Sequence, residues 1–137
     1  MNITLRRAAI WLTVVFLLSL AANLVILGLL NHAMTDIQSE AILGTVLKVH
    51  AVPLGALLAG IFSRQKNGSH VTLAALITAV VVSILWVVIV TFSWWGFPDR
   101  IQAPDVNNRY LNYSSDVAFL LVAMIGYFTG KASASDS

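Results

Sequence analysis

Hydrophobic residues gather in four long stretches along the chain, and polar segments separate them. The stretches cover residues 8–30, 41–62, 71–95 and 114–131. A helix rises about 1.5 Å per residue, so each of the first three stretches is long enough to cross the roughly 30 Å hydrocarbon core of a bilayer. The pattern predicts an all-α integral membrane protein in which residues 1–137 form one domain, a bundle of four transmembrane helices.

The last stretch differs from the others because its strongly apolar part, residues 117–130, is too short for the hydrocarbon core. Either the bilayer is thin there, or the polar residues before 117 lie at membrane depth. In the connection 96–113, Pro104 is a suitable helix start. A helical spacing of four, three and four then leads into the last span, through Val106, Tyr110, Tyr113 and Val117. Trp94 and Trp95 fit an aromatic belt at the membrane surface.

Thr35 and Gln38 match a T-x-x-Q capping box, so the second helix should begin ahead of its apolar part. His32, Asp36 and Glu40 are spaced by four and would share one face of a continuous helix, as metal ligands can. The capping box places His32 before the helix and breaks that face. We therefore expect no metal and no other cofactor.

Composition narrows the class of protein. Of the 137 residues, 58% are hydrophobic and 10% are charged, against roughly 25% charged in ordinary soluble domains. Lipid is therefore the expected solvent. The absence of cysteine excludes disulfides and thiolate chemistry, and no basic face suits nucleic acid. We find no nucleophile–base pair, phosphate loop or paired catalytic carboxylates, so we expect a protein that is not an enzyme.

The basic residues predict the orientation. In a four-span chain, five of them fall on the side of the two termini: Arg6, Arg7, Arg64, Lys66 and Lys131. Arg100 and Arg109 fall on the other side. The positive-inside rule then predicts that both termini are cytoplasmic, in a plasma membrane of the bacterial inner-membrane type.

The second span carries the polar residues that most need an explanation. Lys48 and His50 lie near its middle, and polar groups in hydrocarbon are costly and often functional. His50 can be a neutral histidine bonded between helices, for instance to Ser83 or Asn23. The other interpretation is a polar layer that these residues form with Lys48 around water. Lys48 alone could also extend its stem to the outer surface.

Pro53 in the same span removes one backbone hydrogen bond, and Gly55 adds local freedom. A static kink and a hinge are both consistent with this pair. Small residues also recur every four positions, at Ala51, Gly55 and Ala59 in the second span and at Gly126 and Gly130 in the fourth. Such faces let helices approach closely in lipid. Because they exceed what one bundle needs, they favour assembly of several copies.

Asp116 stands at the head of the last span, seven residues before Ala123 and fourteen before Gly130. On one continuous helix this spacing places its carboxylate on the small-residue face. Lys48 lies on a similar face of the second span. We therefore expect Lys48 and Asp116 to form a buried pair, in which each charge offsets the desolvation of the other.

These patterns favour a small homo-oligomeric channel or pore-like protein, surrounded by the lipid bilayer, in which the second helix lines a polar path. A lone lysine in that lining would favour anions. The alternative is a non-catalytic structural or accessory subunit of a larger membrane complex, whose polar residues meet other membrane subunits. The near absence of mass outside the membrane is compatible with both.

Overall fold

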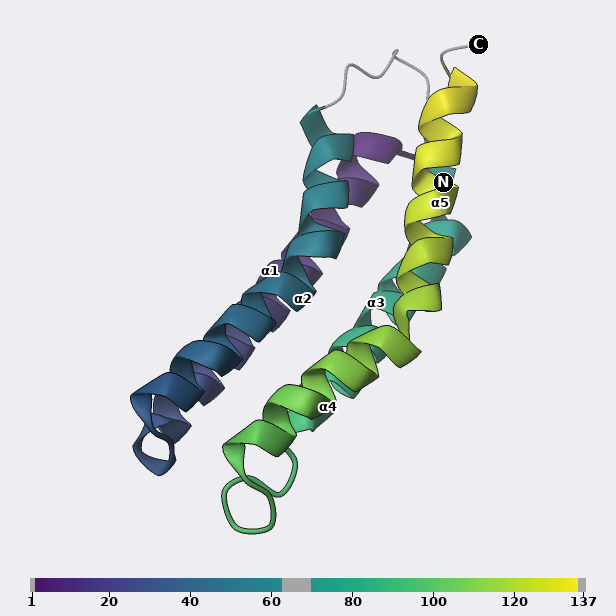
Figure 1. Ribbon diagram of the computed structural model, residues 1–137. Helices are drawn as coiled ribbons and strands as arrows, with labels where there is room; N and C mark the ends of the chain where they lie inside the picture. The colour runs from purple at the N-terminus through teal and green to yellow at the C-terminus, as the bar shows by residue number, and fades with distance from the viewer. Residues whose placement is uncertain (1, 63–69, 136–137) are drawn as a thin grey trace.

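The computed structural model describes residues 2–62 and 70–135. In this part of the chain five α-helices form one elongated bundle (Figure 1). The elements in order are β1 (Asn2–Thr4), α1 (Leu5–Leu30), the 3-10 turn η1 (Asn31–Ala33), α2 (Asp36–Phe62), β2 (His70–Thr72), α3 (Leu73–Thr91), the 3-10 turn η2 (Phe92–Trp94), α4 (Ala103–Asp116) and α5 (Ala118–Ser135).

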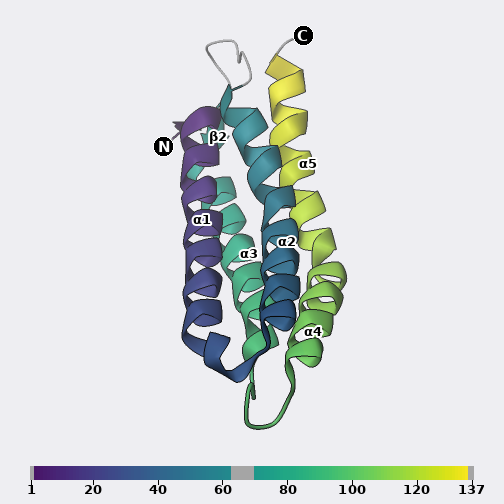
Figure 2. The ribbon, with the colours of Figure 1, turned by 60° about the vertical axis from the view of Figure 1, so that its left-hand side comes forward.

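Three of the described helical segments are long and apolar enough to cross a membrane: Leu5–Ala33, Asp36–Ala59 and Leu73–Trp94. This agrees with the first three predicted spans. The fourth prediction is met only in part, because the described apolar segment of α5, Ala118–Tyr127, is shorter. In its place α4 and α5 lie end to end, and together they extend along the bundle (Figures 1 and 2).

The predicted single helix from the 96–113 connection into the last span is interrupted at Val117, where φ is −102° and ψ is 8°. Three residues of low helix propensity come directly before this break: Ser114, Ser115 and Asp116. The Ser114 hydroxyl donates to the Leu111 carbonyl at 3.1 Å. Such local side-chain hydrogen bonds compete with the regular helix pattern.

The strands β1 and β2 pair antiparallel, with Ile3 opposite Val71. This pairing ties the start of α1 to the start of α3, and the end of α5 lies at the same end of the bundle (Figure 2). We call the opposite end, with η1 and residues 95–102, the loop end. These short strands were not predicted, since three residues carry no readable alternation.

Local chemistry explains where the helices at the loop end begin. The predicted capping box is present before α2: Gln38 N–H donates to Thr35 Oγ1 at 3.3 Å, and Thr35 N–H donates to Gln38 Oε1 at 3.0 Å. Gln102 and Asp105 form a second capping box at α4. Gly96 has a φ of +86°, a left-handed conformation that favours glycine.

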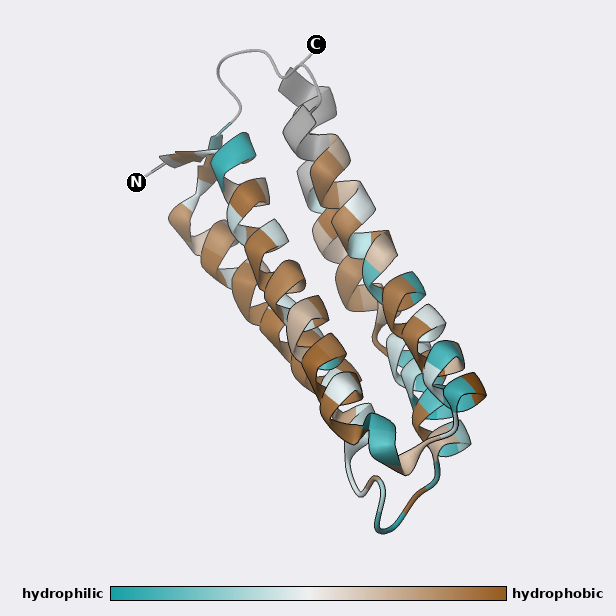
Figure 3. Ribbon diagram, turned by 90° about the vertical axis from the view of Figure 1, so that its left-hand side faces the viewer, coloured by the Kyte–Doolittle hydropathy of each residue, from teal (hydrophilic) through white to brown (hydrophobic). Residues whose placement is uncertain are grey.

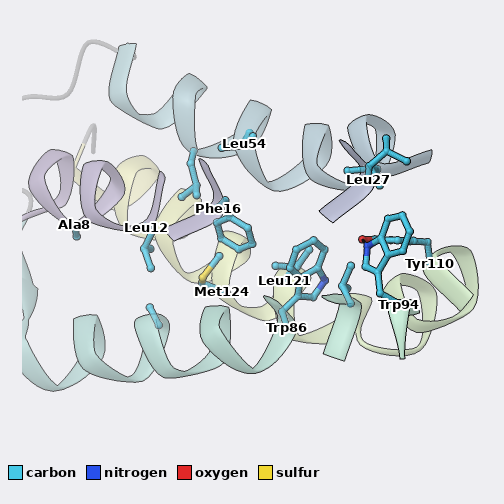
Figure 4. Close-up of a cluster of buried hydrophobic side chains, with 14 of the residues drawn as sticks. Ala8, Leu12, Phe16, Leu27, Leu54, Trp86, Trp94, Tyr110, Leu121 and Met124 are labelled. Carbon is cyan, nitrogen blue, oxygen red and sulfur yellow. Dashed lines mark hydrogen bonds between the residues drawn. The ribbon is translucent and has the colours of Figure 1, made fainter. Parts of the chain in front are cut away.

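Large aromatic side chains fill the core (Figure 4). The Phe16 and Trp86 rings meet edge to face with centroids 5.3 Å apart, and Trp94 and Tyr110 contact each other nearer the loop end. Pro53 is buried in α2, which continues as one α-helix on both sides of it. The structure therefore shows a proline that the helix accommodates without ending.

Candidate functional site: a buried polar network and a polar helix face

Three elements meet at the side chain of Asn23, which is fully buried in α1. Its Oδ1 accepts from the Tyr110 hydroxyl of α4 and from the Trp94 indole N–H of η2 at 3.1 Å. The same indole N–H lies 2.6 Å from the Tyr110 oxygen, and Figure 4 shows these two side chains facing each other. This cluster joins α1 to the loop-end part of the α3–α4 side.

The amide nitrogen of Asn23 extends the network along α1. It donates to the Ser19 carbonyl at 2.9 Å and to Thr91 Oγ1 at 3.2 Å. The Ser19 hydroxyl lies 2.8 Å from His50 Nε2, and His50 Nδ1 lies 2.8 Å from the Val46 carbonyl. A carbonyl only accepts, so Nδ1 carries the hydrogen, and in the neutral ring Nε2 accepts from Ser19.

Asn23 and His50 are therefore brought into one network, as the predicted polar layer requires, but through Ser19. Ser83 lies outside it: its hydroxyl donates to the Ala79 carbonyl at 2.7 Å and lies 3.2 Å from the Met124 sulfur. All three predicted side chains are buried. Their hydrogen bonds are made inside the subunit, the arrangement expected of polar groups that hold helices together.

The network also contains residues that the sequence reasoning missed: Ser19, Thr91, Trp94 and Tyr110. Trp94 was expected in the aromatic belt, yet it is buried while its neighbour Trp95 is 64% exposed. Tyr110 could have been found, since it lies on the recurring apolar face of its helix with Val106, and both are buried. A tyrosine on a buried face needs a partner for its hydroxyl.

Lys48 and Asp116 are both exposed, and the described residues include no ion pair between them. The expected buried pair is therefore not formed in this structure. The break at Val117 is the physical reason, because it ends the seven-residue register on which the prediction depended. In α5 the buried positions are Leu121 and Met124, whereas Ala123 is exposed.

The small-residue face of α2 is not used inside the subunit. Ala51, Gly55 and Ala59 are exposed, and a Cβ added at Gly55 would meet no atom within 4 Å. A Cβ added at Gly126 on α5 would likewise meet no atom within 4 Å. Gly130 lies outside the residues whose side chains are described. Among the described side chains, the predicted packing faces therefore point away from the rest of the subunit.

Apart from Leu111, which is 50% exposed, the exposed surface of α4 is mostly polar, in contrast to the other helices (Figure 3). We call this surface the α4 polar face; its residues are Asp105, Asn108, Asn112, Ser115 and Asp116. The opposite side of α4 packs into the bundle through Val106 and Tyr110. A third side faces α2, where the Thr45 hydroxyl donates to Asn107 Oδ1.

Apolar residues are also exposed toward the loop end. On α1, Leu29 is 70% exposed, and on α3, Val88 is 55% exposed. The Phe92 and Trp95 rings stack with centroids 5.3 Å apart just beyond, as suits the membrane–water interface. Because α4 lies beside α2 and α3 (Figures 1 and 3), its polar face adjoins the part of the bundle where these apolar side chains are exposed.

His32 lies in η1, before the first residue of α2, as the capping box predicted. Its Nδ1 is 3.0 Å from the Leu29 carbonyl. Within residues 2–62 and 70–135 no three potential ligands of the His, Cys, Asp or Glu types gather as a metal site would require.

The geometry thus offers two polar features, one buried inside the subunit and one on its outer surface beside the apolar helices. Comparisons with family models, with curated proteins and with solved structures found no match to this chain.

Proposed function

We propose that this protein is a small homo-oligomeric channel in which the α4 polar faces of neighbouring copies line a water-filled path. The observation that carries this proposal is the position of a polar helix face beside apolar helices of membrane-spanning length. Lipid tails cannot hydrogen-bond exposed amides, hydroxyls and carboxylates, so such groups face water or protein.

The path runs between subunits in this proposal because the interior of each subunit is filled. Asn23 and His50 are both buried, and each forms a hydrogen bond with Ser19 of the same subunit. The lining helix is therefore α4, where the sequence alone favoured α2. The exposed glycines Gly55 and Gly126 leave room for another helix to approach closely, and a closed ring is the usual symmetry of such assemblies.

Along the path, the polar part is followed by an apolar part. From Asp105 to Asp116 the polar face extends ~16 Å. Beyond the break, α5 presents Phe119 and Val122, the latter 69% exposed. A polar vestibule that leads to an apolar constriction is a known design for a gate that closes by expelling water. The basic residues near the termini favour an orientation with the vestibule on the extracytoplasmic side of an inner-membrane-type bilayer.

The sign of the lining charge predicts selectivity. Two carboxylates, Asp105 and Asp116, belong to the polar face. Arg109 lies on the same side of α4 and donates to the Trp95 carbonyl at 2.8 Å. The net charge of this side is therefore negative, so the path should prefer cations. Purified protein in liposomes should pass K⁺ more readily than Cl⁻. Asp116→Asn should reduce that preference, and Asn112→Leu should reduce the flux itself. Asn112→Ser is the matched control that keeps the position polar. Absence of flux from a folded oligomer at every potential and pH would refute the proposal.

Native mass spectrometry from mild detergent tests the assembly separately. A single oligomeric species of this chain agrees with the channel. A monomer that co-purifies with other membrane chains would instead support an accessory subunit, whose partner covers the same polar face. In that case Asn112→Leu should weaken the complex with those chains, and the unsubstituted protein should pass no ions.

A further inference from the structure

A pocket of about 280 Å³ lies between α2 and the junction of α4 with α5. It adjoins the buried network through Trp86, whose ring contacts His50, and it shares Ser115 with the α4 polar face. Polar groups line one part of it, and apolar side chains together with one indole line the rest: Lys48, Ser114, Ser115, Val52, Leu121 and Trp86.

The polar part of the pocket can donate hydrogen bonds to an anionic group. Lys48 contributes an ammonium group and Ser115 a hydroxyl, whereas the Ser114 hydroxyl already donates to the Leu111 carbonyl. No acidic residue lines the pocket; Asp116, which follows Ser115, is exposed on the α4 polar face. Such a set of donors suits a phosphate or carboxylate.

Trp86 forms part of the pocket wall and adds an unusual feature. Its side chain is 1% exposed, and its rings contact Phe16 and His50 edge to face. The indole nitrogen, drawn on the side of the ring away from Phe16 in Figure 4, is the one buried side-chain N or O atom in residues 2–62 and 70–135 without a hydrogen-bond partner. Because this nitrogen is buried, Trp86 presents its ring to the pocket, and its N–H is out of reach of a ligand there.

We propose that this pocket binds one anionic phospholipid, with its phosphate at Lys48 and Ser115 and its ester region against the Trp86 ring. A lipid fits better than a dissolved ion because most of the lining is apolar. Val52 is 67% exposed at the mouth of the pocket, so the acyl chain leaves directly into the bilayer.

The depth of the site is compatible with a headgroup. Lys48 lies seven residues beyond Ala41, ~10 Å along the helix. The α4 polar face provides polar surroundings at that level, and the lysine stem can raise its ammonium toward the surface. The site depends on α4 lying at membrane depth and is independent of ion conduction.

The test uses the full chain in mild detergent, titrated with phosphatidylglycerol or phosphatidylcholine and measured by native mass spectrometry. We expect one phosphatidylglycerol per chain to bind at least tenfold more tightly than phosphatidylcholine. Lys48→Met should lose about tenfold in that affinity, the effect of one charged hydrogen bond, and Lys48→Arg should retain most of it. Trp86→Phe, which keeps an aromatic ring against the pocket, should retain most of the affinity. Arg100→Met removes an exposed charge outside the pocket and should change nothing.

Three results would overturn the proposal. Equal affinity for the two lipids would show that the headgroup charge is not recognised. An equal loss in Arg100→Met would show that the lipid only follows overall charge. Full competition by inorganic phosphate would identify a site for a dissolved anion. Thermal unfolding of each variant separates loss of the site from loss of the fold, and a folded Lys48→Met with unchanged binding also refutes it.

Discussion

Replacing Asn23 tests whether the buried network holds the bundle together. Its side chain bonds to three side chains on other elements, those of Thr91, Trp94 and Tyr110. Polar contacts between membrane helices average about 0.6 kcal/mol each. Asn23→Leu should therefore cost about 2 kcal/mol, and about 3–4 kcal/mol if the buried Tyr110 hydroxyl finds no other acceptor.

The assay is equilibrium unfolding in mixed micelles, with Asn112→Leu as the matched control. Both substitutions replace an asparagine in a helix by leucine, but Asn112 is exposed on the α4 polar face. Its replacement should leave the free energy of unfolding of the subunit nearly unchanged.

A double-mutant cycle with Tyr110→Phe isolates the contact itself. The coupling free energy should be about 0.6 to 1.7 kcal/mol. If Asn23→Leu is no more destabilising than Asn112→Leu, or if the cycle is additive, the network does not stabilise the fold as argued.

Three further substitutions address other parts of the structure. Ser19→Ala removes the partner of His50 Nε2 and should cost about 1 kcal/mol of unfolding free energy, measured in the same micelles. Thr45→Val removes the contact with Asn107 and should cost about 0.6 kcal/mol, which a value of zero would contradict. Gly55→Leu should leave the subunit fold intact, because its Cβ would meet no atom within 4 Å, yet weaken the oligomer in native mass spectrometry; an unchanged oligomer would place the interface elsewhere.

The sequence predicted the elements that depend on local or solvent properties. Hydrophobic length alone located the first three spans, and a capping box located the start of α2 at Thr35 and Gln38. It also indicated that His50 could be bonded between helices. It could not identify Ser19 as the partner, because that choice depends on how α1 and α2 are rotated and shifted against each other. No local pattern encodes this relation.

The error at Asp116 has a similar origin. The seven-residue spacing to Ala123 predicts a shared face only while the helix is continuous, and the structure interrupts it at Val117. A single change of helix direction moves every later residue to a new angular position. Register arguments across residues such as Ser114 and Ser115 therefore need evidence that the helix continues through them.

The length of the last span, in contrast, already limited the possible interpretations to two. Its apolar part could not cross a bilayer, so either the membrane is thin or the polar residues before 117 lie within it. Exposed Leu29 and Val88 on the neighbouring helices favour a membrane that reaches toward the loop end, and so favour the second choice. The polar flank must then be accommodated by water, by protein or by lipid headgroups. Each of these occupants corresponds to a different experiment above, so flux, oligomeric state and lipid binding together determine what covers α4.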